Sequence, residues 1–378
     1  MKRILSIDGG GIRGLFSLQV LARIEALCRE KRGRDDLVLA DEFDLFAGTS
    51  TGAIIACCLS WGMTVKEIED LYLLHGREMF SPMPWHRRLR AKYRADRMAA
   101  TFRRLFVEED GTPADLGSSR LRTMLLVVMR NATTGSPWPI TNNPNAKYNQ
   151  TDSDQCNLRI PLWQLLRAST AAPTYFSPEA IELGGRSFLF VDGGVTPYNN
   201  PALLAAMTAT LPSYRMDWQP GPDRLHLVSV GTGSTRGVFT GTSPDKINIF
   251  RQLSVVPAAL VGSVADQQDL MCRVLGRCVH GPVIDREIGD LIEASAVPRD
   301  EPMFTYARYT RRLDIVDEGS SMPPLRLAQM DNLAAIPQLQ ALGIEYAKAH
   351  VRPEHLEPVS SRIPGNAPTQ AADTAQTG

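Results

Sequence analysis

The stretch FDLFAGTSTGAIIACC, residues 43–58, decides the fold of this chain. A mostly apolar run, 43–47, stops at Gly48, a tight turn follows as far as Gly52, and an apolar stretch without helix breakers comes next. A strand, a sharp turn and a helix in this order form the setting in which the serine of a G-x-S-x-G motif becomes a nucleophile. Here that serine is Ser50. The unpaired N–H groups at the start of the helix favour a developing negative charge.

The motif alone leaves a second interpretation open, in which Ser50 only caps the helix. The residues that precede this stretch support the first interpretation, in which Ser50 is a nucleophile. Residues 3–8, RILSID, indicate a buried strand that the glycines from Gly9 end at once, and 15–33 have helical spacing with Gly33 as a suitable stop. Two strand–turn–helix units in the first part of the chain predict an α/β sheet with mostly parallel strands.

The remaining segments complete an α/β pattern. We expect buried strands at 121–129, 187–191 and 225–230, an exposed strand at 304–315, and helices within 63–110, 161–168, 201–209, 245–300 and 326–350. The polar residues 131–157 predict one long loop, which is usually functional or mobile. The tail 356–378 is rich in Pro, Ala, Thr and Gly without periodicity and is expected to be disordered, which leaves residues 1–355 as one domain.

Composition narrows the class of protein. The 378 residues include 41 basic and 41 acidic side chains, so the basic excess typical of DNA- and RNA-binding proteins is absent. The six cysteines form no C-x-x-C or zinc spacing, which suggests a reducing compartment. The first residues do not resemble a secretory signal, and no stretch reaches the ~20 apolar residues of a spanning helix. We therefore expect a soluble cytoplasmic protein.

Residues 79–93, MFSPMPWHRRLRAKY, combine Met, Phe and Trp with several cations. Apolar and aromatic groups beside positive charges suit a membrane interface or an anionic ligand. The alternative is a surface helix with a solvated basic face.

Three glycine-bearing turns follow predicted strands, at 8–14, 48–52 and 192–194. Ligands of open α/β sheets bind beyond the carboxyl ends of the strands, so these turns are expected to converge. The backbone N–H groups of the first turn suit an oxyanion hole. That turn also satisfies G-x-G-x-x-G, but the next strand does not end in the acidic residue that dinucleotide binding needs, so we do not favour a nucleotide-binding fold.

A nucleophilic serine needs a base. None of the six histidines follows a strand end in a glycine-rich turn, and His226 alternates with leucines inside a strand, so a Ser-His-Asp triad is not favoured. Asp192, before Gly193 and Gly194, is the better candidate for accepting the proton of Ser50 directly. The alternative role of Asp192 is to cap the turn that it begins.

With these residues assembled, the chain resembles the patatin-like phospholipase family. The resemblance is carried by five blocks in order: IDGGGIRG (7–14), GTSTG (48–52), ASTAAPTYF (168–176), VDGGVTPYNNP (191–201) and VSVGTG (228–233). It implies a three-layer α/β/α fold with a mostly parallel sheet, and lipid acyl hydrolysis that needs no metal or other cofactor. It further implies that Ser50 is the nucleophile and Asp192 the base. The other implied site residues are Gly9, Gly10 and Gly11 for the oxyanion hole, with Arg13, Gly48, Gly52, Gly193 and Gly194 in support.

Within the family, the insertion at 131–160 resembles that of bacterial effectors of cyclic-oligonucleotide antiphage signalling. This implies an activating cyclic dinucleotide, such as cyclic GMP-AMP, and peripheral action on phospholipid of the inner membrane. Candidate ligand residues are Asn142, Asn143, Lys147, Tyr148 and Arg159. The same loop could equally be a substrate lid, and a homo-oligomer is left open.

Two alternatives to an activated phospholipase remain from the sequence. One is a nucleotide-sensing binding protein whose hydrolase site is vestigial, and the other is a constitutive patatin-like lipase or esterase.

Overall fold

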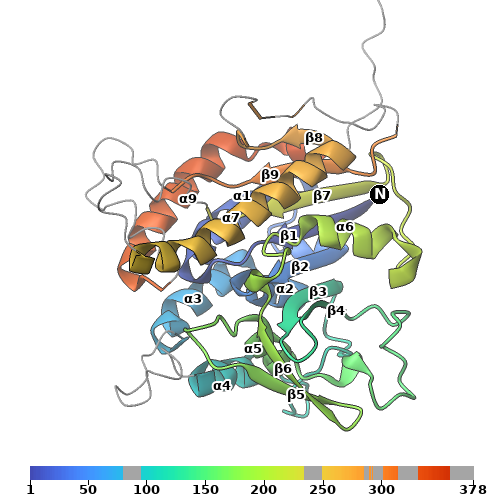
Figure 1. Ribbon diagram of the computed structural model, residues 1–378. Helices are drawn as coiled ribbons and strands as arrows, with labels where there is room; N and C mark the ends of the chain where they lie inside the picture. Colours follow the sequence, from blue (N-terminus) through green and yellow to red (C-terminus); the bar gives the residue numbers. More distant parts are fainter. Residues whose placement is uncertain are drawn as a thin grey trace, which may run out of the picture.

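The computed structural model describes residues 1–79, 95–233, 249–284, 289–290, 292, 301–313 and 331–357. Over these residues, a nine-stranded mixed sheet has the order β5-β6-β3-β2-β1-β7-β9-β8, and β4 pairs with β3 off this path (Figure 1). The strands are β1 (Lys2–Ile7), β2 (Leu45–Thr49), β3 (Met124–Asn131), β4 (Ser136–Thr141), β5 (Glu179–Leu183), β6 (Arg186–Asp192), β7 (Leu225–Val230), β8 (Arg277–His280) and β9 (Thr305–Tyr309).

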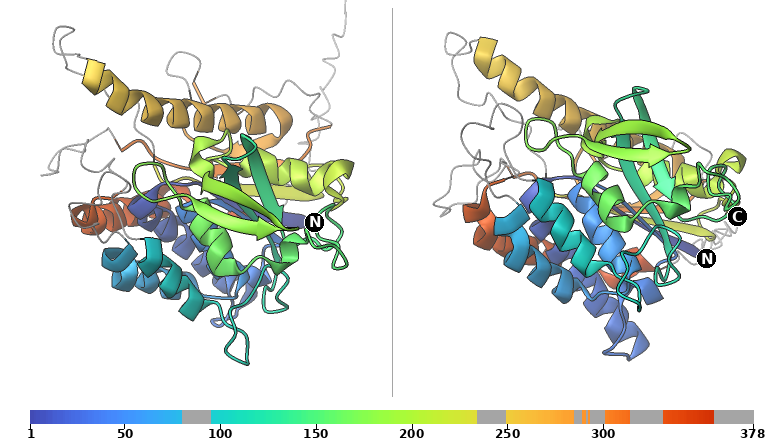
Figure 2. Two further views of the ribbon diagram at one scale, coloured as in Figure 1. Left: turned by 60° about the horizontal axis from the view of Figure 1, so that its bottom comes forward. Right: turned by 90° about the horizontal axis from the view of Figure 1, so that it is seen from below.

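Helices cover both faces of the sheet. They are α1 (Gly14–Arg32), α2 (Thr51–Ser60), α3 (Val65–Met79), α4 (Ala95–Leu105), α5 (Leu162–Ser169), α6 (Ala202–Thr210), α7 (Ile249–Leu275) and α9 (Ile336–His350). Figure 2 shows α7 on one side of the sheet and α1, α3 and α9 on the other. Alternate residues of a strand point to opposite faces of the sheet. Leu5 and Ile7 of β1 belong to the hydrophobic cluster that contains residues of α1, α2 and α9, whereas Ile4 belongs to the cluster that contains residues of α6.

The parallel part of the sheet is built from β3, β2, β1, β7, β9 and β8, and each neighbouring pair in this series is parallel. Strands β4, β5 and β6 are antiparallel additions. The expected three-layer α/β/α fold with a mostly parallel sheet is confirmed. All the parallel strands end at one edge of the sheet, which is called the carboxyl edge below; the opposite edge is the amino edge.

Several expected elements were wrong in detail. The long loop expected at 131–157 contains β4, which folds back onto β3 through a hairpin and places Ser136 opposite Asn131. Strand β5 was missed, and β8 interrupts the helix expected over 245–300. Short strands with prolines or few residues give too little alternation to be recognised from sequence.

The strand expected to be exposed at 304–315 is β9, and all five of its residues are buried. It lies between β7 and β8, so both of its edges are paired. The arginines of this stretch suggested solvent exposure, but Arg308 is buried and its charge is paired with Asp8. Residues 80–94 of the membrane-interface candidate, and 358–378 of the tail, lie outside the described residues.

All six cysteines are free and buried. None of the described helices combines the length and the apolar character needed to cross a membrane.

Candidate active site

The register of the sheet brings Ser50 and Asp192 to one level at the carboxyl edge. Strand β2 pairs in parallel with β3, with Thr49 opposite Val128, so Ser50 follows at the level of Met129. Strand β6 overlaps β3 only by its last three residues, and there Asp192 is opposite Met129. Two residues 142 positions apart in the sequence therefore meet because two strands end beside the same residue of β3.

The turn after β2 has the geometry of a strained nucleophile elbow. Ser50 has φ 54° and ψ −122°, a backbone conformation that L-residues rarely adopt and that costs of order 1–3 kcal/mol. A Cβ on Gly48 would lie 2.2 Å from the carbonyl oxygen of Gly52, and one on Gly52 would lie 2.2 Å from that of Ile7. Both glycines of the motif are thus required for the close approach of α2 to the sheet.

The hydroxyl of Ser50 donates to Oδ2 of Asp192 at 2.6 Å. The second oxygen, Oδ1, accepts the backbone N–H of Gly194 at 2.6 Å and caps the short helix that begins at Gly193. The two roles considered for Asp192 are therefore compatible, since each uses a different oxygen. A Cβ on Gly193 would lie 2.3 Å from the carbonyl oxygen of Val128, so the turn packs directly on β3.

Burial raises the pKa of Asp192 to about 6. The side chain is only 5% exposed, and loss of hydration disfavours the charged carboxylate. The hydroxyl of Ser50, the N–H of Gly194 and the positive charge of Arg167 each oppose this rise. The resulting carboxylate is ionised at neutral pH and still basic enough to accept a proton.

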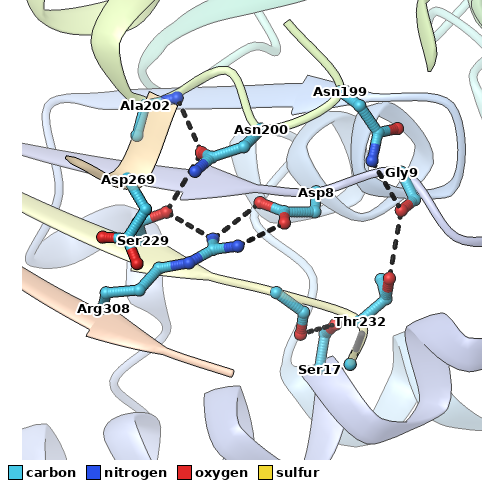
Figure 3. A network of polar contacts seen from close by, with 12 residues as sticks. Asp8, Gly9, Ser17, Asn199, Asn200, Ala202, Ser229, Thr232, Asp269 and Arg308 are labelled. Carbon is cyan, nitrogen blue, oxygen red and sulfur yellow. Dashed lines mark hydrogen bonds and ion pairs between the residues drawn. The ribbon is translucent and has the colours of Figure 1, made fainter. Parts of the chain in front are cut away.

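The glycine loop after β1 is anchored through Gly9 (Figure 3). The N–H of Gly9 donates to the carbonyl oxygen of Asn199 at 3.1 Å, and its own carbonyl accepts Thr232 Oγ1 at 3.0 Å and Asn199 Nδ2 at 3.4 Å. The N–H of Gly9 is thus engaged in holding the loop. The N–H groups of Gly10 and Gly11 donate to no backbone carbonyl of the described chain outside its helices and strands.

Arg13 lies against the same loop. Its Nε donates to the carbonyl oxygen of Gly10 at 3.2 Å and its Nη1 to that of Gly233 at 3.3 Å. Burial lowers its pKa to about 10, so the guanidinium remains charged at neutral pH. Of the two roles expected for Arg13, holding the loop fits these contacts better than binding a lipid phosphate.

None of the histidines among the described residues hydrogen-bonds to Ser50 or Asp192. His226 is fully buried at the amino end of β7, and burial lowers its pKa to about 3. The rings of His280 and His355 stack on each other at 4.6 Å between centroids. His86 lies outside the described residues. The dyad geometry therefore agrees with the choice of a carboxylate base over these histidines.

Asn142 and Asn143 of the ligand candidates are engaged within the fold. Asn142 Oδ1 accepts the N–H of Leu125 at 2.7 Å, and Asn143 Nδ2 donates to the carbonyl oxygens of Tyr214 and Arg215. Leu125 is near the start of β3, so this loop lies at the amino edge. Ser50 lies at the other edge, at the level of Met129. Leu125 is four residues before Met129 on β3, so the loop and Ser50 are about 13 Å apart along the strand direction, at about 3.3 Å per residue. A substrate lid does not fit this position.

The other three ligand candidates have exposed side chains. Lys147 Nζ lies 5.1 Å from the ring centre of Tyr148, and Tyr148 is 53% exposed. Arg159 is exposed and donates to the carbonyl oxygen of Thr151. Among the five ligand candidates, these cationic and aromatic groups are the exposed ones.

Three residues of the site were not named from the sequence: Ser169, Asn199 and Thr232. Each lies inside a block that carried the family resemblance, so the signal was present. Ser169 accepts the N–H of Ser50 at 3.0 Å, and the other two hold Gly9. Their roles depend on contacts between distant blocks, which a single sequence does not reveal.

Comparison with known proteins agrees with this geometry. Residues 5–206 match the family model described as patatin-like phospholipase. A cGAMP-activated phospholipase of Vibrio cholerae is 33% identical over 214 residues, which cover 53% of this chain and 56% of the relative. A cGAMP-activated phospholipase of Escherichia coli is 28% identical over 236 residues, covering 61% and 62%. Patatin-17 of Solanum cardiophyllum is 28% identical over 253 residues, covering 62% and 61%.

The matched segments span about three fifths of the length of these relatives. The family model matches more than half of the chain, and its bounds enclose both Ser50 and Asp192. The resemblance carried by the five blocks is thereby confirmed, and the chain belongs to the patatin-like phospholipase family.

Proposed function

We propose that this protein is a metal-independent serine acyl hydrolase that cleaves fatty-acyl esters of membrane phospholipids. The observation that carries the proposal is the 2.6 Å hydrogen bond from the hydroxyl of Ser50 to the buried carboxylate of Asp192. A nucleophile within hydrogen-bond reach of its base, on a strained elbow above a sheet, is the arrangement that acyl transfer requires.

The reaction has two halves. Ser50 Oγ attacks the ester carbonyl while Asp192 Oδ2 takes its proton, and the N–H groups of Gly10 and Gly11 stabilise the tetrahedral oxyanion. Collapse of this intermediate breaks the ester bond, and the leaving lysophospholipid alkoxide receives the proton from Asp192. A water molecule, deprotonated by the same carboxylate, then attacks the acyl-enzyme. Fatty acid is released, and the proton returns to Ser50.

We include peripheral action at the inner membrane in the proposal, and the shape of α7 supports it. Its 27 residues span about 40 Å at 1.5 Å per residue, about twice the length of the six-residue β7. The helix ends at the amino edge, where β8 begins, so its first half extends beyond the carboxyl edge (Figure 2). None of the residues 259–267 is buried, and Leu260 is 61% exposed. A helix segment with an exposed apolar side chain is suited to the bilayer interface.

A matched pair of variants tests this approach. Leu260→Asp should weaken sedimentation with phospholipid vesicles and slow hydrolysis of vesicle lipid, while hydrolysis of a soluble ester stays unchanged. Ser263→Asp carries the same charge on an exposed polar residue of the same helix segment and serves as the control. Equal vesicle binding by wild type and Leu260→Asp would exclude this face of α7 as the membrane contact.

Activation by a cyclic dinucleotide, and a part in antiviral defence, complete the proposal. Two relatives are named as cGAMP-activated phospholipases, at 33% and 28% identity. The exposed pair Lys147 and Tyr148 offers a cation for a phosphate and a ring on which a base can stack. In this proposal the activator binds at the amino edge and acts on the site through the strands.

The test is release of fatty acid from phospholipid vesicles, with and without a panel of cyclic dinucleotides. Wild type should be active with at least one of them and insensitive to EDTA, whereas Ser50→Ala and Asp192→Ala should be inactive and folded. Equal rates of fatty-acid release with and without each cyclic dinucleotide would favour a constitutive lipase. Binding of a labelled cyclic dinucleotide without any hydrolysis would favour a nucleotide sensor with a vestigial site. Activity retained by Asp192→Ala would overturn the dyad.

A further inference from the structure

A buried ion pair joins the glycine loop to a strand far along the chain. Asp8, the last residue before the loop, and Arg308 of β9 are each 4% exposed. Arg308 Nη1 donates to Asp8 Oδ1 at 2.8 Å and Nη2 donates to Oδ2 at 2.5 Å, which is a bidentate pair (Figure 3). The two residues are 300 positions apart, and Arg308 lies beyond residues 5–206 that match the family model.

The same guanidinium reaches the other anchor of the loop. Arg308 Nη1 also donates to Ser229 Oγ at 2.7 Å, and Ser229 Oγ donates to Asn200 Oδ1 at 3.3 Å. The preceding residue, Asn199, holds Gly9 through both its backbone carbonyl and its side-chain amide. Arg308 therefore connects β9 and β7 to the segments that hold the loop from both sides (Figure 3).

The position of Asp8 makes its charge relevant to the reaction. Its carboxylate is buried two residues before Gly10, whose N–H is one of the two proposed oxyanion donors. A second negative charge in a buried site would oppose the charge that develops on the oxyanion, because Coulomb interactions are strong where water is excluded. A carboxylate without its partner would also favour movement of the loop toward water.

We propose that Arg308 is a positioning residue for the oxyanion loop. It neutralises Asp8 and fixes the base of the loop, so that the N–H groups of Gly10 and Gly11 face the oxyanion without an uncompensated anion beside them. This inference rests on the proposed hydrolase function, and it adds a residue from the part of the chain outside the family match.

Three variants test it with a soluble chromogenic ester, which avoids vesicle binding. Arg308→Met should lower kcat about 100-fold with KM within about threefold, since misplacing a loop of this kind by about 1 Å costs about that factor. Asp8→Asn/Arg308→Met removes both charges and should recover at least about tenfold of the loss. Arg308→Lys keeps one charge without the bidentate geometry and should lose about tenfold. It also covers the case in which Arg308→Met does not fold.

Arg3→Met is the matched control. Arg3 pairs at 2.6 Å with Glu42, whose side chain is 6% exposed and also pairs with Arg32, at the amino end of the same strand that Asp8 follows. Breaking this pair should lower the melting temperature, while kcat stays at the wild-type value. If both variants lose kcat in proportion to stability, Arg308 is only structural and the inference is overturned.

Backbone hydrogen exchange separates this inference from the proposed function. In Arg308→Met the hydrogen-bonded amides of Gly9 and Arg13 should exchange at least about tenfold faster than in wild type, and those of α1 beyond them should not. This result without hydrolysis by wild type would contradict the proposed function and leave the positioning role supported. Unchanged exchange at Gly9 and Arg13 together with unchanged kcat would overturn the positioning role.

Discussion

Ser169 of α5 accepts the backbone N–H of Ser50 at 3.0 Å and donates its own proton to the carbonyl oxygen of Val128 at 2.6 Å. One buried hydroxyl thus ties the nucleophile elbow to both α5 and β3. Because Ser50 has a positive φ, its backbone needs such support to keep the conformation that exposes its hydroxyl to Asp192.

Removing this hydroxyl should loosen the elbow. Ser169→Ala leaves a buried N–H and a buried carbonyl without a partner, so we expect a loss of about 1–3 kcal/mol in the free energy of unfolding. We also expect kcat to fall about tenfold with little change in KM, measured with a soluble ester. Ser6→Ala is the control, since Ser6 is fully buried in β1 and its hydroxyl has no partner among the described residues. That control should be neutral or stabilising, and a wild-type kcat in Ser169→Ala would contradict the role of this contact.

The pKa of Asp192 sets the expected pH dependence of the rate. The base must be ionised, and burial raises its pKa to about 6. The logarithm of kcat should therefore rise with pH, bend near 6 and level off above about 7. The midpoint should hardly move with temperature, as is typical of a carboxylate. A midpoint that falls clearly on warming would indicate an imidazole and would exclude Asp192 as the titrating base.

The same pKa has a consequence for stability. The pKa of Asp192 lies above its ordinary value of 3.8, so the folded chain holds this proton more tightly than the unfolded chain. The stability gained from the protonated form is complete below about pH 4 and is lost as pH rises through about 6. In Asp192→Asn the side chain at position 192 does not titrate, so the variant does not lose stability in this way as pH rises. The unfolding free energy of wild type minus that of the variant should decrease between pH 4 and 7, as measured by urea titration, and a constant difference would contradict the raised pKa.

The contact between Ser50 and Asp192 could be predicted because each residue lies at the end of a strand. Ser50 and Asp192 each end an apolar run, and in an α/β sheet such positions meet at one edge. The contact itself depends on a detail that this general rule does not include. Asp192 ends an antiparallel strand, β6, and only the last three residues of β6 pair with β3. The sequence pattern contains no sign of that register.

Arg308 shows why other parts of the site could not be predicted. Arginines in an alternating segment are usually exposed, and the several arginines of 304–315 predicted a solvent-facing strand. The partner of Arg308, Asp8, precedes a glycine loop 300 residues earlier, and only the closing of the sheet by β7 and β9 brings the two together. Ser169, unlike Arg308, lies in a block that carried the family resemblance, so the sequence did point to its neighbourhood.

The proposed activator should depend on the exposed pair of the amino-edge loop. In Lys147→Ala/Tyr148→Ala the concentration of cyclic dinucleotide for half-maximal activation should rise at least about tenfold, because a phosphate contact and a stacking surface are removed. The rate at saturating activator should stay at the wild-type value. Gln150→Ala, an exposed residue of the same loop, is the control. Equal half-maximal concentrations for the double variant and wild type would place the activator elsewhere.

Gly10 tests the oxyanion loop itself. A Cβ on Gly10 would lie 2.1 Å from Thr232 Oγ1, the hydroxyl that holds the carbonyl of Gly9, so the loop or Thr232 must move. Gly10→Ala should therefore lower kcat by about 10²–10³, the loss typical of removing one oxyanion donor, while the chain stays folded. Gly262→Ala is the matched control: its added Cβ has no atom within 4 Å, and alanine in α7 should stabilise the helix by up to about 1 kcal/mol without changing kcat on a soluble ester. If Gly10→Ala keeps the wild-type kcat, the oxyanion donors must come from another part of the site.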